Sequence, residues 1–288
     1  MTISLRGLEF VPVSEATTLM GTTKGGWVYA GQRPCYEAKT PAFYVMPSPL
    51  TEGQIATAMG VSPEDNQDPR PSESITSREL KELASRLMDS SAFSDAVGKL
   101  NGRWELRALT QAEWQAARNQ KVLTLQNGLT ERLADAPSSN NRGAMMDGRP
   151  RPNELLGPAA AQTAAIAVHP RNDAVTAITS VPIDRPLPKV VARLVLSPIR
   201  SEEVKRVPEH TDRWRNVRSE LLWTTVLGIV PSFLIPVLRG MGDYATEGWV
   251  NLLFGGLCAG FFTGAIWRPR RPVLHYDDVE SSSMSVVQ

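Results

Sequence analysis

The sequence predicts an α+β soluble domain with much irregular chain, followed by two transmembrane α-helices. Over roughly the first 200 residues, helix-start signals alternate with short runs rich in β-branched and aromatic residues. The chain contains 22 prolines and 21 glycines, which is typical of a fold with long loops. Two long apolar runs without charge follow. The expected parts are a domain over 1–200, a basic juxtamembrane linker over 201–219, a two-helix transmembrane hairpin over 220–268 and a flexible tail over 269–288.

Three helices of the domain are expected to begin with a capping box, in which a hydroxyl residue precedes Glu or Gln by three positions. The pairs are Thr51 with Gln54, Thr76 with Glu79, and Thr110 with Glu113. After Thr76, apolar residues recur at i, i+3, i+4 and i+7, so that helix should bury one face. Strands rich in β-branched and aromatic residues are expected over 8–13, 42–46 and 191–197.

The two apolar runs, 221–238 and 249–267, are long enough to cross a bilayer. At 1.5 Å per residue the first spans about 27 Å, close to the hydrocarbon thickness. Buried helices of a soluble core are the alternative, but two such runs without charge favour transmembrane helices. Trp223, Trp249 and Trp267 lie near the ends of the runs and are the expected interface anchors.

The distribution of Lys and Arg predicts that both ends of the hairpin are cytoplasmic. The connecting loop holds only Arg239, whereas cations cluster on both flanks: Lys205, Arg206, Arg213, Arg215 and Arg218 before the first run, and Arg268, Arg270 and Arg271 after the second. The protein is therefore expected in a cytoplasmic (inner) membrane with two spans. Anionic lipid is an expected contact of Arg268, Arg270 and Arg271.

The second run carries a stripe of small residues, because Gly256, Gly260 and Gly264 are spaced four apart. Such a stripe lets another backbone approach closely in a membrane. Two partners fit equally well: the first span of the same hairpin, at Gly228 or Ser232, or a second membrane protein.

Composition excludes several classes of protein. The formal net charge is +1, so no basic field indicates nucleic-acid binding. The two cysteines, Cys35 and Cys258, lie far apart, which excludes a disulfide framework or a cysteine-rich metal site. The first ten residues lack the pattern of a cleavable signal peptide.

The segment RALTQAEWQAAR, from Arg107, resembles a signature of the formylglycine-generating enzyme (sulfatase-modifying factor) family, Arg-Leu-Pro-Thr-Glu-Ala-Glu-Trp-Glu-Tyr-Ala-Ala-Arg. Collinear landmarks extend the resemblance over about residues 5–199: GLEFVPV, LMGT, RPCYEAKTPAFYVM, SESITSRELKELASRLM, PNELLG and VARLVLSP. The signature positions are Arg107, Thr110, Glu113, Trp114, Arg118 and, in the closing strand, Arg193. The resemblance implies a C-type-lectin-like fold with a small twisted sheet, two or three helices and long coil.

The residues that carry catalysis in this family are missing. Its enzymes hold copper on a pair of cysteines late in the domain, and a related branch binds iron through a His-rich motif. Here the corresponding region, from Ala159, is alanine-rich without cysteine, and His169, His210 and His275 are isolated. The resemblance therefore implies a pseudoenzyme without catalytic residues, cofactor or metal. Glu113, Trp114 and Arg118 are expected to hold the fold through burial, capping and ion pairs rather than to catalyse.

These observations favour a non-catalytic, membrane-anchored interaction subunit that docks on a larger membrane complex, such as an energy-transducing or transport assembly. Its expected partners are other membrane protein subunits and the lipid bilayer. Two alternatives stay open. One is a membrane-bound enzyme with a rebuilt active site on the same fold. The other is a sensor or defence protein that acts through its membrane hairpin.

Overall fold

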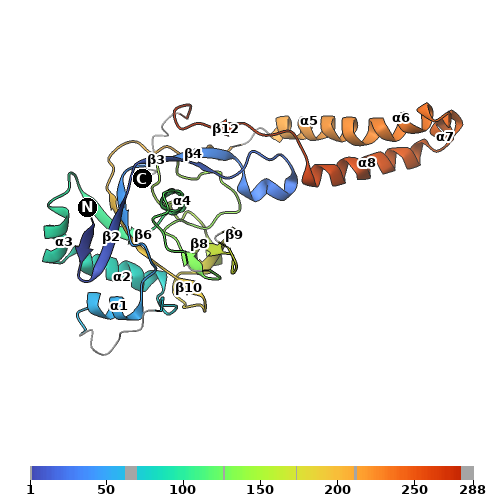
Figure 1. Cartoon of the computed structure of the whole chain (residues 1–288). Coiled ribbons are helices and arrows are strands. Elements are labelled where there is room, and N and C mark those ends of the chain that lie inside the picture. The colour runs from blue at the N-terminus through green and yellow to red at the C-terminus, as the bar shows by residue number, and fades with distance from the viewer. Residues whose placement is uncertain (1, 62–69, 126, 173, 211–212, 280–288) are drawn as a thin grey trace.

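The computed structural model describes residues 2–61, 70–125, 127–172, 174–210 and 213–279. It is a mixed α+β structure, in which a domain of sheets and short helices carries a long helical arm. The arm consists of the two last long helices of the chain, which run side by side away from the domain (Figure 1).

A five-stranded antiparallel sheet forms the centre of the domain. Its strands, in spatial order, are β1 (Ile3–Leu5), β2 (Leu8–Val13), β5 (Phe43–Val45), β11 (Leu194–Pro198) and β6 (Trp104–Ala108). Successive side chains of a strand point to opposite faces, so Leu194 and Leu196 enter one apolar core and Val195 enters another. The sheet is therefore buried on both faces.

Three helices cover the first face: α1 (Glu52–Ala58), α2 (Ser77–Met88) and α3 (Ser91–Val97). The capping boxes at Thr51 and Thr76 are both present, as the sequence predicts. Leu80, Leu83 and Leu87 of α2 are buried, which confirms the expected apolar face. Helix α3, which has a simple cap at Ser90, was not expected.

The second face packs against α4 (Gln111–Asn119), which begins with the third predicted capping box, at Thr110. A four-stranded sheet completes this core: β10 (Val190–Val191), β7 (Thr130–Arg132), β8 (Gln162–Val168) and β9 (Val175–Pro182). β10 and β7 are parallel, and the other pairs are antiparallel. The short 3₁₀ helix η3 (Gly157–Ala161) leads into β8.

The expected strands occur at 8–13 and within 42–46, whereas the third is interrupted. Ala192 and Arg193 separate β10 from β11, because Arg193 turns its side chain into the domain instead of continuing a ladder. The β8–β9 hairpin was missed altogether: its alanine-rich sequence has weak strand preference, and pairing within the fold outweighs it.

A three-stranded sheet lies next to the helical arm. It contains β12 (Val273–Leu274), β4 (Cys35–Thr40) and β3 (Ala16–Met20). The loop between β3 and β4 holds the 3₁₀ helix η1 (Trp27–Gln32), which reaches toward the base of the arm (Figure 1).

Two helices of the arm are long and apolar enough to cross a membrane, Arg213–Leu238 and Trp249–Ile266. The first consists of α5 (Arg213–Thr224), the π-helical segment η4 (Thr225–Ile229) and α6 (Val230–Leu238). Pro231 has no N–H for the Leu227 carbonyl, which accounts for the wider π turn directly before it. The short α7 (Gly242–Glu247) connects α6 to α8 (Trp249–Ile266).

Two domain boundaries differ from those expected. The first long helix begins at Arg213, so the last part of the predicted linker 201–219 is helical. Within the predicted flexible tail 269–288, Val273 and Leu274 pair with Cys35 and Tyr36 of β4. Residues 269–279 are thus attached to the domain, because the β4 edge offers free backbone groups to a strand. The remainder of the tail lies outside the described residues.

Candidate functional site

Glu113, the carboxylate of the signature, is completely buried and connects α4 with β6 and β11. Arg107 of β6 donates two hydrogen bonds to it, at 2.7 and 2.8 Å. Ser197 of β11 donates a third and the Thr110 backbone N–H a fourth, both at 2.9 Å. Burial alone would raise the pKa of Glu113, but the Arg107 guanidinium and these bonds hold it below its usual value. Glu113 is therefore a charged structural group and a poor base.

A second buried ion pair contacts α4 through Trp114. The guanidinium of Arg193 donates to Glu131 of β7 at 2.6 and 3.0 Å and to the Pro47 carbonyl at 2.6 Å. The indole N–H of Trp114 donates to the same Glu131 carboxylate at 2.9 Å. Trp114 is fully buried, and Arg118 lies over its ring with 5.6 Å from guanidinium carbon to ring centroid. The signature residues thus gather around α4.

The glycine stripe of α8 packs within the hairpin. A Cβ on Gly256 would lie 2.7 Å from the Ser232 hydroxyl, and one on Gly260 would lie 2.6 Å from the Thr224 methyl group. A Cβ on Gly228 of the first helix would overlap the Gly256 carbonyl. Gly264 accommodates the Arg268 guanidinium in the same way. Of the two partners that fit the stripe, the structure therefore contains the first span.

Arg268 closes the base of the hairpin through contacts with both of its helices. Its Nε donates to Glu220 at 2.8 Å, and Nη2 donates to the Gly260 carbonyl at 3.2 Å. The side chain is only 3% exposed, and the contact of Arg268 with anionic lipid stays a prediction. Arg270 stays exposed, and Arg271 is partly exposed with a bond to Asn216 at 3.4 Å. The sequence analysis overlooked Glu220, a carboxylate at the edge of an apolar run, as a partner for Arg268.

The loop that carries η1 contacts this base directly. Trp27 packs edge-on against Phe261 of α8, with 4.8 Å between ring centroids, and the Arg268 guanidinium lies over the Trp27 ring at 5.6 Å from its centroid. Gly25 and Gly26 allow the close approach, because a Cβ on either would overlap the backbone of 265–269. Trp223 and Trp267 also meet edge to face here, at 5.6 Å, whereas the third expected anchor, Trp249, begins α8 at the far end of the arm.

The segment that follows the hairpin is bound to the domain by hydrogen bonds of its backbone. The Arg271 N–H donates to the Thr23 carbonyl at 2.8 Å, β12 then pairs with β4, and the Tyr276 N–H donates to Glu37 at 3.2 Å. Lys205, which precedes the hairpin, donates to the Tyr276 carbonyl at 2.9 Å. We call residues 23–28, 220 and 267–276 the junction.

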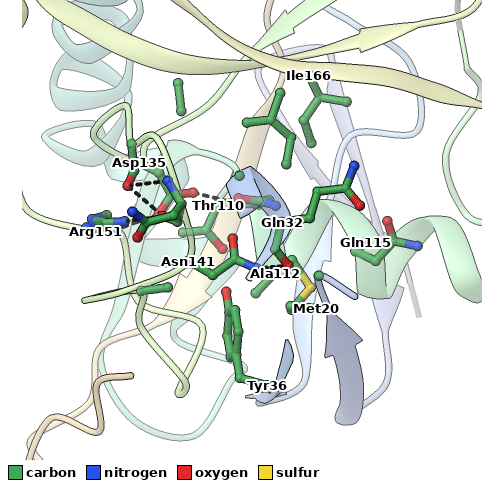
Figure 2. A pocket seen from close by; sticks show the side chains of 18 of the residues that line it. Met20, Gln32, Tyr36, Thr110, Ala112, Gln115, Asp135, Asn141, Arg151 and Ile166 are labelled. Atoms are coloured by element: carbon green, nitrogen blue, oxygen red, sulfur yellow. Dashed lines mark hydrogen bonds between the residues drawn. The ribbon is translucent and has the colours of Figure 1, made fainter. Parts of the chain in front are cut away.

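A cavity of about 680 Å³ opens between the N-terminus of α4, the β8–β9 hairpin and the β3–β4 connection with η1. Figure 2 shows its wall: Tyr36 rises from one side, Asp135 and Arg151 lie at another, and Ile166 of β8 covers the top. Amide and hydroxyl side chains share the lining with apolar ones: Gln32, Thr110, Gln111, Gln115 and Asn141 with Met20, Ala112 and Ile178.

Asp135 is a carboxylic acid of the cavity whose pKa is shifted toward neutral. Its two carboxylate oxygens accept the backbone N–H groups of Gln111 at 2.6 Å and Arg151 at 2.7 Å. Desolvation nevertheless dominates and raises the pKa of Asp135 to about 6. Burial, and after it the charge of Asp135, also raises the pKa of Tyr36. The sequence analysis did not single out Asp135, because the segment that it begins, DAPSS, resembles an ordinary loop.

Among the described residues, no group of three or more His, Cys, Asp and Glu side chains has the geometry to hold a metal ion. Cys35 is buried in β4, and Cys258 lies in α8. His275 bonds to Glu37 at 3.0 Å beside β12, far along the chain from His169 in the β8–β9 turn.

Comparison with solved structures gives distant similarities. The chain resembles PvdO from Pseudomonas aeruginosa (13% identity, TM-score 0.49, 66% of this chain and 94% of that one). It also resembles Treponema denticola variable protein 1 (13%, 0.45, 69% and 99%) and CarF (12%, 0.36, 66% and 98%). No family model matches the chain, and no curated protein matches it by sequence. At these values the similarities do not define the fold.

Replacing Glu113 with Gln is expected to lower the free energy of unfolding by about 3–5 kcal/mol, because Arg107 would remain buried without its main counter-charge. Urea unfolding of the full chain in detergent, followed by tryptophan fluorescence, measures the loss. Glu82→Gln is the matched control: Glu82 pairs with Arg86 at 2.6 Å, but both side chains are more than half exposed. Its effect should stay below about 1 kcal/mol. Equal effects of the two changes would contradict the structural role of Glu113.

Gly260→Leu is expected to force the two long helices apart, because its side chain has no room against Thr224. The melting temperature of the full chain in detergent should fall. Gly255→Leu changes the same residue type on the same helix where no atom lies within 4 Å, and it should leave the melting temperature unchanged. The packing described for the stripe is refuted if both variants melt alike.

Proposed function

We propose that the protein is a membrane-anchored, non-catalytic interaction subunit whose domain is presented to a neighbouring membrane protein in a fixed orientation. The observation that carries the proposal is the junction. A flexible tether would let the domain reorient, but here Trp27 of the domain packs against Phe261 and Arg268, the Arg271 N–H donates to the Thr23 carbonyl, and β12 pairs with β4. Fixed geometry is of use to a protein that must dock at a defined place on a membrane assembly.

The proposed topology has both spans in a cytoplasmic (inner) membrane, with residues 1–200 and the C-terminus in the cytoplasm. The excess of Lys and Arg on the domain side supports it. So does the placement of Trp223 and Trp267 at the domain end of the hairpin and of Trp249 at the other end, because indole rings favour both interfaces.

We further propose that residues 1–200 are a degenerate domain of the formylglycine-generating enzyme family with a C-type-lectin-like fold. The support is the sequence signature together with the contacts that the signature residues make. Arg107, Glu113, Trp114 and Arg193 form ion pairs and hydrogen bonds that hold α4 between the sheets. A carboxylate with four donors and a lowered pKa supports a framework role rather than catalysis.

One observation favours a second candidate, an enzyme with a rebuilt active site. Asp135 lines a cavity and has a pKa of about 6, so it could exchange a proton near neutral pH. The described lining holds no histidine or cysteine to act as its partner. This composition favours binding over proton transfer, and we therefore place the enzyme second.

The test is purification of the protein from its native membranes in mild detergent, with the mass measured by light scattering and companions identified. A complex of defined stoichiometry is expected. Arg268→Met should stay in the membrane but recover less of the companion, because the orientation of the domain is loosened. Arg270→Met, an exposed neighbour, is the control. A lone monomer from wild-type membranes would overturn the proposal.

Topology is tested separately, by labelling introduced cysteines with a membrane-impermeant maleimide. Glu247→Cys, exposed at the end of α7, should react in intact cells, whereas Lys81→Cys, exposed on α2, should react only after the cells are opened. The native cysteines give little background, because Cys35 is buried and Cys258 lies within α8. The reverse labelling pattern would refute a cytoplasmic domain.

A further inference from the structure

We propose that the cavity between α4, β8–β9 and η1 binds a basic side chain, a lysine ammonium or an arginine guanidinium, from a juxtamembrane segment of a neighbouring membrane protein. The cation site stands on the cavity itself. Only the source of the cation rests on the function proposed above.

The first argument is the unbalanced charge of Asp135. The other deeply placed carboxylates each have an arginine: Glu113 has Arg107, Glu131 has Arg193, and Asp147 has Arg149 at 2.9 Å. In the described part of the chain, Asp135 accepts only two backbone N–H groups and has no ion-pair partner. A carboxylate accepts up to about four hydrogen bonds, so acceptor capacity and negative charge remain at the cavity wall.

The second argument is an unused hydroxyl beside it. Tyr36 is only 4% exposed, and none of its described neighbours forms a hydrogen bond with its hydroxyl group. Figure 2 shows the hydroxyl pointing into the cavity, on the side where Asn141 lies. Asn141 uses its amide N–H groups on the Gln32 and Pro34 carbonyls, at 3.2 and 3.1 Å, so its oxygen is an acceptor. Acceptors from three elements thus surround one space.

Three arginines also line the cavity, and several of their donors are engaged by the protein itself. Arg149 donates to the Glu202 and Glu203 carbonyls and pairs with Asp147, and Arg151 donates to the Asn140 and Arg142 carbonyls. Arg118 lies over the Trp114 ring. The carboxylate of Asp135, the hydroxyl of Tyr36 and the amide oxygen of Asn141 remain as acceptors, which fits a ligand with N–H donors.

The mouth of the cavity points to a polypeptide near the membrane. Leu19, Val28 and Ile178 line it and stay about half or more exposed, which gives apolar contact to the stem of a long side chain and its backbone. Val28 belongs to η1, the helix whose first residue packs on α8. A segment just outside a membrane span can therefore reach the cavity. On the cytoplasmic side such segments are enriched in Lys and Arg.

Binding is tested by calorimetry on the full chain in phosphatidylcholine nanodiscs, with capped lysine and capped arginine as probes and capped norleucine as the neutral control. We expect the two cationic probes to bind and norleucine not to bind. Asp135→Asn should weaken binding about tenfold or more and Tyr36→Phe several-fold, whereas Asp184→Asn, an exposed carboxylate, should have no effect. Tyr36→Phe keeps the test valid if Asp135→Asn misfolds.

The pH dependence gives an independent readout. Between pH 7.5 and 5, a carboxylate with a pKa of about 6 goes from almost fully ionised to about one tenth ionised, so the affinity should fall roughly tenfold. The charged groups that face Asp135 are Glu113, with a lowered pKa, and Arg107. Arg151 lies beside Asp135, and Tyr36, with a raised pKa, lies on another side of the cavity (Figure 2). The lowered pKa of Glu113 and the raised pKa values of Arg107 and Tyr36 keep these three groups from titrating in this range. An affinity that is the same at both pH values would overturn the role of Asp135.

The source of the cation is tested by recovery of companions from native membranes with wild type, Asp135→Asn and Asp184→Asn. Recovery lost only in Asp135→Asn, and displaced by capped lysine, supports the juxtamembrane segment. Probe binding without any effect on recovery would overturn that source and leave a site for free amines. A stoichiometric companion without probe binding would overturn the cation site while the proposed function stands. A lone monomer that binds no probe would overturn both.

Discussion

The position of α4 depends on one buried ion pair, between Arg107 and Glu113. Arg107 is on β6 opposite Val195 of β11, so it projects from the sheet face that α4 covers. Glu113 meets it there and also binds Ser197 and the Thr110 N–H. Because buried charges are costly unless they are paired, the pair specifies one register of helix against sheet. That register in turn places Thr110 and Gln111 at the cavity and aims the Gln111 N–H at Asp135.

The sequence contains strong local signals for part of this arrangement. Three capping boxes and the strand at 8–13 are encoded within a few residues of chain, and they appear where predicted. Glu131 and Ser197 could not be predicted as partners of Arg193 and Glu113, because they lie 62 and 84 residues away along the chain. The cavity is still less predictable, since its wall comes from β3, β4, α4, β8, β9 and three loops. The β8–β9 hairpin is stable through pairing and burial rather than through strand preference.

The hairpin illustrates how a sequence pattern can have a definite physical reason and still leave its partner open. Small residues every fourth position require a close neighbour, but the pattern is the same whether the neighbour belongs to the same chain or to another. Here Gly228, which is isolated in the sequence, faces Gly256 and Gly260 and completes the contact. The stripe is therefore occupied inside the hairpin. A second membrane protein would have to contact the outward side chains, such as Phe254 and Phe262, which are both more than two-thirds exposed.

Fixing the domain on the hairpin changes the energetics of docking. A domain on a flexible linker loses rotational freedom when it binds, and this loss weakens binding unless other contacts offset it. The junction orders the domain before any partner arrives, through Trp27 on α8, Arg268 over the Trp27 ring, and β12 on β4. Since η1 belongs both to the junction and to the cavity wall, the same contacts fix the height of the cavity above the predicted interface. A single charged side chain at that height could then contribute most of its interaction energy to binding, because little ordering would remain to be done.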